Sequence, residues 1–236
     1  MRSRSKNDKA MIDGASRPGR DRQSRIHFIL ANTRLFAPGL VPEVKLHLAE
    51  ESLPIWEKTE IELDEINLPP PFWAFAWAGG QALARYVLDN PQFVSGKRIL
   101  DLGSGSGLVA IAAMHAGAAH ACAADIDAYS SVAASLNALA NVVVLDVSEA
   151  DLLETTPAGI DVVLVGDLFY ERGMSDRVLA FMQRMASAGA LVLVGDPRRS
   201  YFPVDRFETV AHYEVATTRE LEDNEVKRAD VWRFKP

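Results

Sequence analysis

Residues 101–107 combine one acidic residue with three closely spaced glycines, in the order Asp-Leu-Gly-Ser-Gly-Ser-Gly. The run follows a short apolar stretch, so we expect it to join a strand to a helix, where open α/β sheets bind ligands. Glycines at such a turn allow positive φ and a close approach of the backbone to a ligand. The spacing excludes a dinucleotide fingerprint, which would need glycine in place of Leu108, and the chain has no Gly-Lys-Ser/Thr of a P-loop.

The acid at the start of this run indicates which ligand it takes. Its charge would repel a pyrophosphate and attract an ammonium group. S-adenosylmethionine has an amino-acid end and no phosphate, so we predict it as the cofactor. A glycine-rich turn alone is a weak signal, and the acid and its setting strengthen it. The predicted contacts are Asp101, Gly103, Ser104, Gly105 and Gly107.

Two more acids follow the next two predicted strands. Asp125 ends the second strand, where a carboxylate can bind both hydroxyls of a ribose; the alternative is a helix N-cap, a role that we assign to Asp127. Asp151 follows the third strand and is positioned to accept a hydrogen bond from an adenine amino group, or it is a solvated loop acid. Ile126 and Leu152, which come next to these acids, complete this part of the cofactor site.

Four motifs in this order are similar to those of the seven-β-strand methyltransferases that use S-adenosylmethionine. They are DLGSGSG, AADID, EADLL and GDLFYE. The aromatic segment PFWAFAWAGGQALARYVLDNP, the GDLFYE run and GDPRR are more particular, and together they resemble the lysine methyltransferases of the electron transfer flavoprotein β subunit. The resemblance covers about Thr33 to Pro236.

This resemblance implies a protein-lysine N-methyltransferase whose partner is the electron transfer flavoprotein β subunit. It implies that Asp167, Tyr170 and Glu171 line the acceptor site, while Gly166 and Trp77 contact the cofactor. Because a carboxylate favours the protonated amine, we assign Asp167 to positioning the lysine and not to strong-base work. The alternative is that Tyr170 or its neighbour Phe169 packs in the core.

Other readings of the same motifs remain open. A methyltransferase of ribosomal-protein or small-molecule amines would share the sheet and the glycine loop, and a noncatalytic scaffold would bind the cofactor alone. A nucleic-acid methyltransferase would need Asn/Asp-Pro-Pro-Tyr/Phe after the fourth strand, and the run that begins at Asp167 lacks both prolines.

Apolar runs alternate with helical patterns from residue 97 onward. Strands without polar alternation, separated by helices, indicate a parallel sheet covered on both faces. We therefore predict an α/β fold with a doubly wound, mostly parallel, seven-stranded Rossmann-like sheet that ends in an antiparallel hairpin. The predicted strands are 98–102, 119–124, 142–147, 160–166, 190–195, 207–217 and 226–234, and the predicted helices are 81–89, 106–116, 128–139 and 174–187. Residues 42–51 are predicted as a short helix or an irregular cap.

Composition places these elements in one globular protein. Hydrophobic residues make up 48% and charged residues 24% of the 236, which excludes wholesale disorder and a disulfide scaffold. The single cysteine indicates a reducing compartment. The net charge is −7, yet residues 1–25 hold eight basic and three acidic residues, so that segment is +5 and the rest is −12.

We divide the chain into a disordered basic tail (1–30), a cap with the aromatic segment (31–95) and the methyltransferase domain (96–236). Three acids in the first 25 residues count against a transit peptide, so we expect the bacterial cytoplasm, with the mitochondrial matrix as the alternative. We expect a monomer that binds neither nucleic acid nor membranes. The five histidines show no ligand spacing, so we predict no metal.

Overall fold

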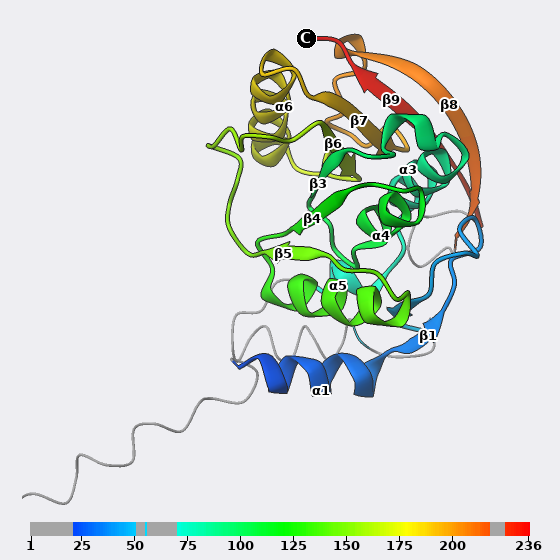
Figure 1. Ribbon diagram of the computed structural model, residues 1–236. Coiled ribbons are helices and arrows are strands. Elements are labelled where there is room, and N and C mark those ends of the chain that lie inside the picture. Colours follow the sequence, from blue (N-terminus) through cyan, green and yellow to red (C-terminus); the bar gives the residue numbers. More distant parts are fainter. Residues whose placement is uncertain (1–20, 51–54, 56–69, 218–224) are drawn as a thin grey trace, which may run out of the picture.

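A seven-stranded sheet forms the centre of the molecule in a computed structural model that describes residues 21–50, 55, 70–217 and 225–236 (Figure 1). Its strand order is β5-β4-β3-β6-β7-β9-β8. The first five of these strands are parallel, and β9 pairs antiparallel with both β7 and β8. The predicted fold class is confirmed. Among the described residues, no helix is long and apolar enough to cross a membrane.

The strands agree closely with the apolar runs of the sequence. Their bounds are β3 Arg98–Leu102, β4 His120–Ala124, β5 Asp146–Ser148, β6 Val162–Gly166, β7 Leu191–Asp196, β8 Phe207–Ala216 and β9 Val226–Phe234. Short strands of buried β-branched and aliphatic residues suit a sheet that is covered on both faces. All five parallel strands therefore end at one edge, and the chain reverses its winding direction there between β3 and β6.

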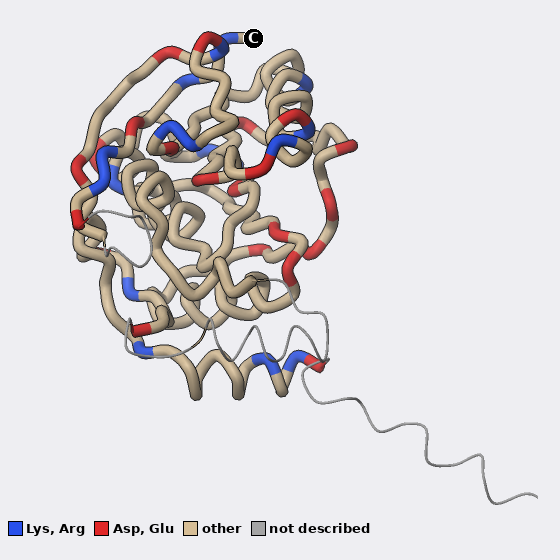
Figure 2. Tube along the Cα trace, turned by 180° about the vertical axis from the view of Figure 1, so that it is seen from behind, with Lys and Arg blue, Asp and Glu red and all other residues tan. Residues whose placement is uncertain are grey.

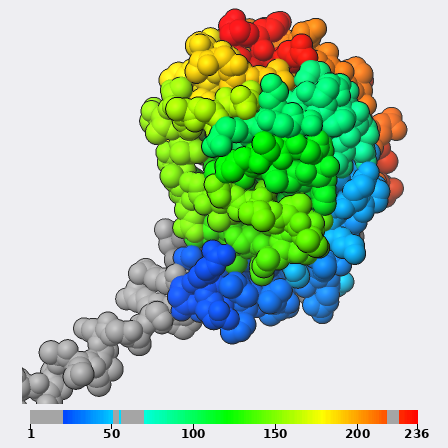
Figure 3. All heavy atoms as spheres, in the orientation of Figure 1, coloured from blue at the N-terminus to red at the C-terminus, as the bar shows by residue number. Residues whose placement is uncertain are grey.

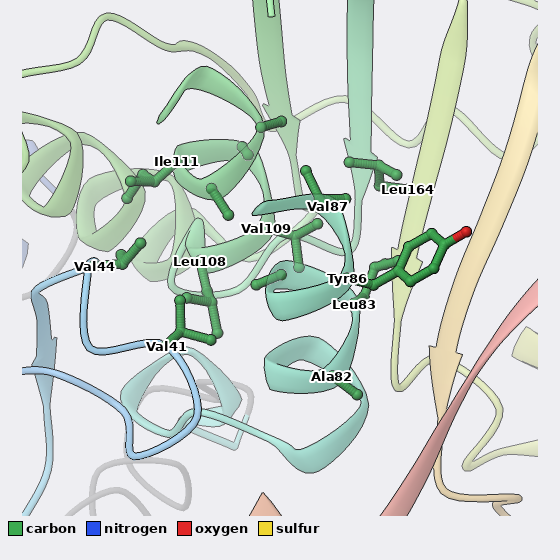
Figure 4. Close-up of a cluster of buried hydrophobic side chains, with 14 of the residues drawn as sticks. Val41, Val44, Ala82, Leu83, Tyr86, Val87, Leu108, Val109, Ile111 and Leu164 are labelled. Carbon is green, nitrogen blue, oxygen red and sulfur yellow. The ribbon is translucent and has the colours of Figure 1, made fainter. Parts of the chain in front are cut away.

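Different helices pack on the two faces of the sheet. On one face α3 (Ala78–Asp89) and α4 (Leu108–His115) pack with alternate strand residues into one apolar cluster, part of which Figure 4 shows. On the other face α6 (Arg172–Ser187) packs with the intervening strand residues and with Trp232. Since α3 belongs to the segment that we assigned to the cap, the cap and the sheet share a core.

Short 3-10 helices and two small strands complete the described chain. The 3-10 helices are η1 Phe72–Ala74, η2 Pro91–Phe93 and η3 Val204–Arg206, and the small strands are β1 Arg34–Phe36 and β2 Leu46–Leu48. β1 and β2 pair antiparallel, so the predicted helix over 42–51 is wrong, and the irregular cap that was its alternative is interrupted by a strand at 46–48. The prediction overlooked an alternation of apolar residues at every second position, which is typical of a strand. These residues, Val44, Leu46 and Leu48, are all buried.

The third predicted strand is displaced along the chain. Residues 142–145 lie before the strand, and β5 covers only Asp146–Ser148. Val142 has a φ of 57° and is 93% exposed, and Val144 is 82% exposed. A run of valines favours a strand by propensity, but here it forms the solvent-exposed connection between α5 (Ala128–Ala140) and the sheet edge.

The predicted disordered tail is wrong at its C-terminal end. Residues Arg22–Asn32 form helix α1, whose first turn is capped by the Asp21 side chain accepting from the Ser24 N–H at 2.7 Å. Ile29 is fully buried in an apolar cluster with Trp73 and residues of α5. Figures 1 and 3 show α1 in blue at one end of the molecule. The prediction for residues 1–20 lies outside the described residues.

Candidate active site

The glycine loop between β3 and α4 has the backbone that its sequence predicts. Gly103, Gly105 and Gly107 have φ of 66°, 49° and 79°, the left-handed region that favours glycine. Gly107 is the N-cap of α4, and a Cβ on it would lie 3.0 Å from the Cβ of Ala134. The loop therefore needs glycine for its conformation and for its packing against α5.

Asp101 anchors the helix that follows this loop. Its side chain is buried, and its Oδ2 accepts a hydrogen bond from the Ala110 N–H at 3.0 Å. Burial raises the pKa of Asp101 to about 7, and the charge of Asp125 acts in the same direction, while the Ala110 N–H opposes it. The carboxyl group thus ties the end of β3 to the first turns of α4; its predicted contact with an ammonium group stays a prediction.

Asp125 joins the end of β4 to the glycine loop. One carboxylate oxygen accepts from the Gly105 N–H and the other from the Asp127 N–H, both at 2.9 Å. Burial raises the pKa of Asp125, although both backbone bonds favour its charged form. Asp127 caps α5 by accepting from the Tyr129 N–H at 2.9 Å, as we predicted. Next to Asp125, Ile126 is 63% exposed, so an apolar side chain faces outward beside this acid.

Asp151 lies farther along the same edge of the sheet, in an exposed ion pair. Its Oδ2 is 2.7 Å from a guanidinium nitrogen of Arg177 in α6, and its Oδ1 accepts from the Leu153 N–H. The Arg177 hydrogen bond lowers the pKa of Asp151. Leu152, between them, is half-buried. Contact between Asp151 and an adenine stays a prediction, and such a contact would have to share the carboxylate with Arg177.

The acceptor loop after β6 separates its two aromatic residues. Phe169 is fully buried against Phe202 and Phe207, so it belongs to the core. Tyr170 is 44% exposed, with its ring centroid 5.5 Å from that of Phe72. Of the two aromatic residues, Phe169 is therefore the one that packs in the core, and Tyr170 faces outward.

Asp167 has an uncommon backbone for an aspartate. Its φ is 58°, and its N–H donates to the Gly195 carbonyl at the end of β7. The side chain is buried; Oδ2 accepts from the Gly80 N–H at 2.7 Å, and Oδ1 accepts from the Arg199 guanidinium. Strained conformations of this kind are found at functional sites. Glu171 follows as the N-cap residue of α6 and is exposed.

The two glycines after Trp77 serve close packing of backbones. A Cβ on Gly79 or on Gly195 would collide with the carbonyl oxygen of the other, so the start of α3 lies directly against the end of β7. Gly166 is similarly close to Gly80, since a Cβ there would be 3.2 Å from the Gly80 Cα. The start of α3 is therefore packed closely on the ends of β6 and β7.

The aromatic residues before α3 divide between the core and the site. Trp73 is buried and stacks on Tyr129, with ring centroids 6.0 Å apart. Trp77 is half-buried, and its Nε1 donates to the Phe72 carbonyl at 2.9 Å. A Cβ on Gly105 would meet the Trp73 Cα at 3.8 Å, so the aromatic segment lies against the glycine loop at Trp73; the contact of Trp77 with the cofactor stays a prediction.

Two residues of the site were absent from the predicted set. Asp196, at the end of β7, is fully buried, and its Oδ2 has no hydrogen-bond partner among the described residues. Arg199 pairs with Asp167 at 2.6 Å. Both belong to GDPRR, whose acid and arginines the sequence offers either as contacts to a protein substrate or as part of a tight turn, and their position after a parallel strand is the signal that identifies them.

Comparison with known proteins decides the family. Residues 82–168 match the model of the ribosomal protein L11 methyltransferase (PrmA) family. The electron transfer flavoprotein β subunit lysine methyltransferase of Xenopus laevis is 37% identical over 216 residues, which cover 89% of this chain and 86% of that protein. The human protein of the same name is 33% identical over 89% of this chain and 81% of its own length. The chain belongs to the family of electron transfer flavoprotein β subunit lysine methyltransferases.

The predicted family and enzyme class are therefore confirmed. Among solved structures, one described as an RNA methyltransferase from Pyrococcus horikoshii is 16% identical, with a TM-score of 0.52 over 78% of this chain and 98% of that one. At this identity it supports the fold alone. Among the described residues, no three His, Cys, Asp or Glu side chains are grouped so that they could hold a metal ion.

The residues at the carboxyl edge of the sheet fit the methyl donor of this family, S-adenosylmethionine. Asp125 lies beside the glycine loop and retains a second lone pair on each oxygen for hydroxyl groups. Ile126 offers an apolar surface beside this carboxylate. In the lysine methyltransferase these groups would hold the ribose and the adenine, and the residues after β6 and β7 would face the acceptor.

Proposed function

We propose that this chain transfers methyl groups from S-adenosylmethionine to lysine side chains of the electron transfer flavoprotein β subunit. The observation that supports the substrate is the extent of the similarity. Identity to relatives named for this activity covers 89% of the chain, including the loops after β6 and β7. The ribosomal protein L11 methyltransferase model ends at residue 168, before Tyr170 and Glu171.

A neutral amine is required, because only the neutral nitrogen has a lone pair to donate. Because a lysine side chain has a pKa of about 10.4, its deprotonation at pH 7 costs about 4.6 kcal/mol. Desolvation and positive charge near the amine reduce this cost, and fixed orientation lowers the barrier further. Phe72, whose ring contacts those of Trp77 and Tyr170, forms with them an aromatic wall that excludes water from the acceptor.

When bound, S-adenosylmethionine would supply an electrophilic methyl carbon to the neutral lysine nitrogen, and the electron pair of the broken carbon–sulfur bond would stay on its sulfur. The methylated ammonium then releases a proton to solvent. In this scheme Asp125 and the glycine loop bind the donor, while Asp167 accepts a hydrogen bond from the amine and so directs its lone pair.

The test uses purified electron transfer flavoprotein β subunit, isotopically labelled S-adenosylmethionine and peptide mapping by mass spectrometry. We expect label on one or a few neighbouring lysines with the wild type. Asp167→Asn should bind the cofactor normally and lose most of its turnover. If the β subunit stays unlabelled while another protein in the same lysate is labelled, the proposed substrate is wrong.

Charge bears on substrate approach in the same experiment. Outside residues 1–25 the chain carries −12, which predicts attraction of a basic surface and slower methylation at higher salt. Figure 2 shows basic residues interspersed with acidic ones, so the field is not uniformly negative. A rate that does not fall with added salt would contradict this part of the proposal.

Ribosomal protein L11 is the second candidate substrate. The match of residues 82–168 to that family favours it. This stretch contains the glycine loop and Asp125, which serve any methyltransferase of this fold, and it lacks most of the acceptor loop. Purified L11 in a parallel reaction therefore discriminates the two substrates, and we expect it to stay unlabelled.

A further inference from the structure

The carboxylate assigned to the acceptor lysine already has a cationic partner. The Arg199 guanidinium donates twice to Asp167 Oδ1, from Nε at 3.0 Å and from a terminal nitrogen at 2.6 Å. The other oxygen of Asp167 accepts from the Gly80 N–H at 2.7 Å. The side chain of Arg199 is 19% exposed and that of Asp167 is 9% exposed. The pair is thus largely removed from water, at the end of the strands where the acceptor must arrive.

The surroundings of Arg199 fix its position. Its guanidinium carbon is 5.5 Å from the centroid of the Trp77 ring, within the range of a cation–π contact. Its backbone N–H donates to Asp196 Oδ1 at 2.7 Å. Asp196 is fully buried, and its Oδ2 has no hydrogen-bond partner among the described residues. Arg199 therefore lies between two buried carboxyl groups that come from adjacent strands.

An uncompensated carboxylate would work against the reaction. At a separation of about 4 Å and an effective dielectric constant of about 20, it would favour the ammonium form of lysine by about a thousand-fold. Asp167 paired with a guanidinium carries no net charge as a unit, yet Oδ2, which accepts the Gly80 N–H, has a second lone pair that can accept an N–H from an amine.

We propose that Arg199 is a positioning residue of the acceptor site: it fixes the Asp167 carboxylate and offsets its charge, so that the target lysine is held there as a neutral amine. This inference rests on the proposed lysine methyltransferase function. It assigns a task to a residue that touches Asp167 and Trp77 and need not touch the methyl donor.

Other charged and titratable groups face this pair. Tyr170 and Glu171 follow Asp167 on the acceptor loop, and Asp196 lies at the end of β7. The charges of Glu171, Asp125 and Arg199 all act on Tyr170, and burial is the main cause that raises its pKa. The pKa of Asp196 is raised to about 7, mainly by burial and next by the charge of Asp167. The charge of Arg199 opposes this rise.

The first arm of the test measures stability and needs no substrate. A carboxyl group whose pKa is raised on folding stabilises the folded protein at low pH, and this contribution is lost as pH rises from about 4 to about 7. Because the positive charge of Arg199 lowers the pKa of Asp196, removing it should raise this pKa further, and the loss of stability should then continue to higher pH. Arg199→Gln should therefore lower the melting temperature more at pH 8 than at pH 5, and an equal change at the two pH values would overturn the charge-offset argument.

The second arm measures kcat/KM against pH from 6.5 to 9.5 on the lysine substrate that the wild type modifies. Arg199→Gln should lose at least ten-fold at pH 7, which corresponds to one unit in the amine pKa, and should recover toward wild type at pH 9.5. Arg199→Lys, which keeps the charge and loses the paired donors, should lower kcat without moving the profile. In Asp167→Asn, adding Arg199→Gln should no longer shift the profile, since no carboxylate charge remains at that position.

Arg85→Gln is the matched control. Arg85 is 18% exposed and pairs with Glu43 and Asp89, away from the acceptor loop. Its loss should lower stability and leave the pH profile parallel to that of wild type, and cofactor affinity measured by calorimetry should be unchanged in both arginine variants. The inference would be overturned if the pH profile of Arg199→Gln were parallel to that of wild type, or if Arg85→Gln showed the same shift. If the wild type labelled no lysine, the proposed function would be overturned, and the stability measurement would decide on Arg199.

Discussion

Replacing Asp125 with alanine tests the cofactor half of the site. Each oxygen of this carboxylate accepts one backbone N–H at 2.9 Å, from Gly105 and from Asp127, and keeps a second lone pair for a ribose hydroxyl. A hydrogen bond to a charged group contributes about 1.5–3 kcal/mol, so the loss of even one raises the dissociation constant about 10- to 150-fold. Losing both ribose contacts together with the anchored glycine loop should reach the upper part of this range.

Stability should change less than affinity in this variant. Burial raises the pKa of Asp125, so the folded protein stabilises its charge less than water does, and removing the group offsets part of the lost hydrogen bonding. Isothermal titration of S-adenosylmethionine into the folded variant measures the affinity, and circular dichroism confirms that it is folded.

Asp127→Ala provides the matched control. This neighbouring acid caps α5 through the Tyr129 N–H, and loss of an N-cap costs about 0.5–2 kcal/mol of stability. It should lower the melting temperature and change the affinity little. An Asp125→Ala affinity within about three-fold of wild type, or equal losses in the two variants, would refute the ribose assignment. Tight binding of NADH by the wild type would refute the cofactor class.

Three further predictions concern stability. Ile29→Ala should cost about 2–5 kcal/mol in chemical denaturation, because this fully buried side chain holds α1 against the body; a change near zero would mean that α1 is not packed. Gly195→Ala should cost at least about 1–3 kcal/mol, since its Cβ would collide with the Gly79 carbonyl, whereas Gly39→Ala, with nothing within 4 Å, should be nearly neutral; similar costs would contradict the close contact. The raised pKa of Asp101, about 7, predicts a stabilising contribution at low pH that is lost between about pH 4 and 7, so Asp101→Asn should flatten the fall of melting temperature with rising pH over this range.

Local sequence determined the strands, the helices and the glycine loop. Apolar runs without alternation, such as Val162–Gly166, form parallel strands because both of their faces are buried, and this is visible in the residues themselves. The positive φ of Gly103, Gly105 and Gly107 follows from a spacing that only glycine satisfies easily. The acids at strand ends are likewise visible, because all parallel strands end at the same edge of the sheet.

Sequence patterns failed where packing against a distant partner decided the outcome. The valines at 142–144 have strand propensity, yet they lie outside β5; Val142 and Val144 are exposed, and only Val143 packs against the core. The predicted tail extended the polar composition of residues 1–25 as far as residue 30, yet Ile29 is buried beside Trp73, and that contact stabilises the helix. Burial of Phe169 and exposure of Tyr170 also depended on Phe202 and Phe207, which follow more than thirty residues later.

The sequence by itself determined the family, the fold class and the acids that could bind a methyl donor, because these depend on short-range spacing. Only the tertiary structure decided what those acids contact. The Asp167 carboxylate meets the Arg199 guanidinium across 32 positions of the chain, and Gly79 meets Gly195 because the start of α3 lies against β7. Charge offset and close backbone contact act over a few ångströms in space, and no local pattern encodes which distant residue will supply them.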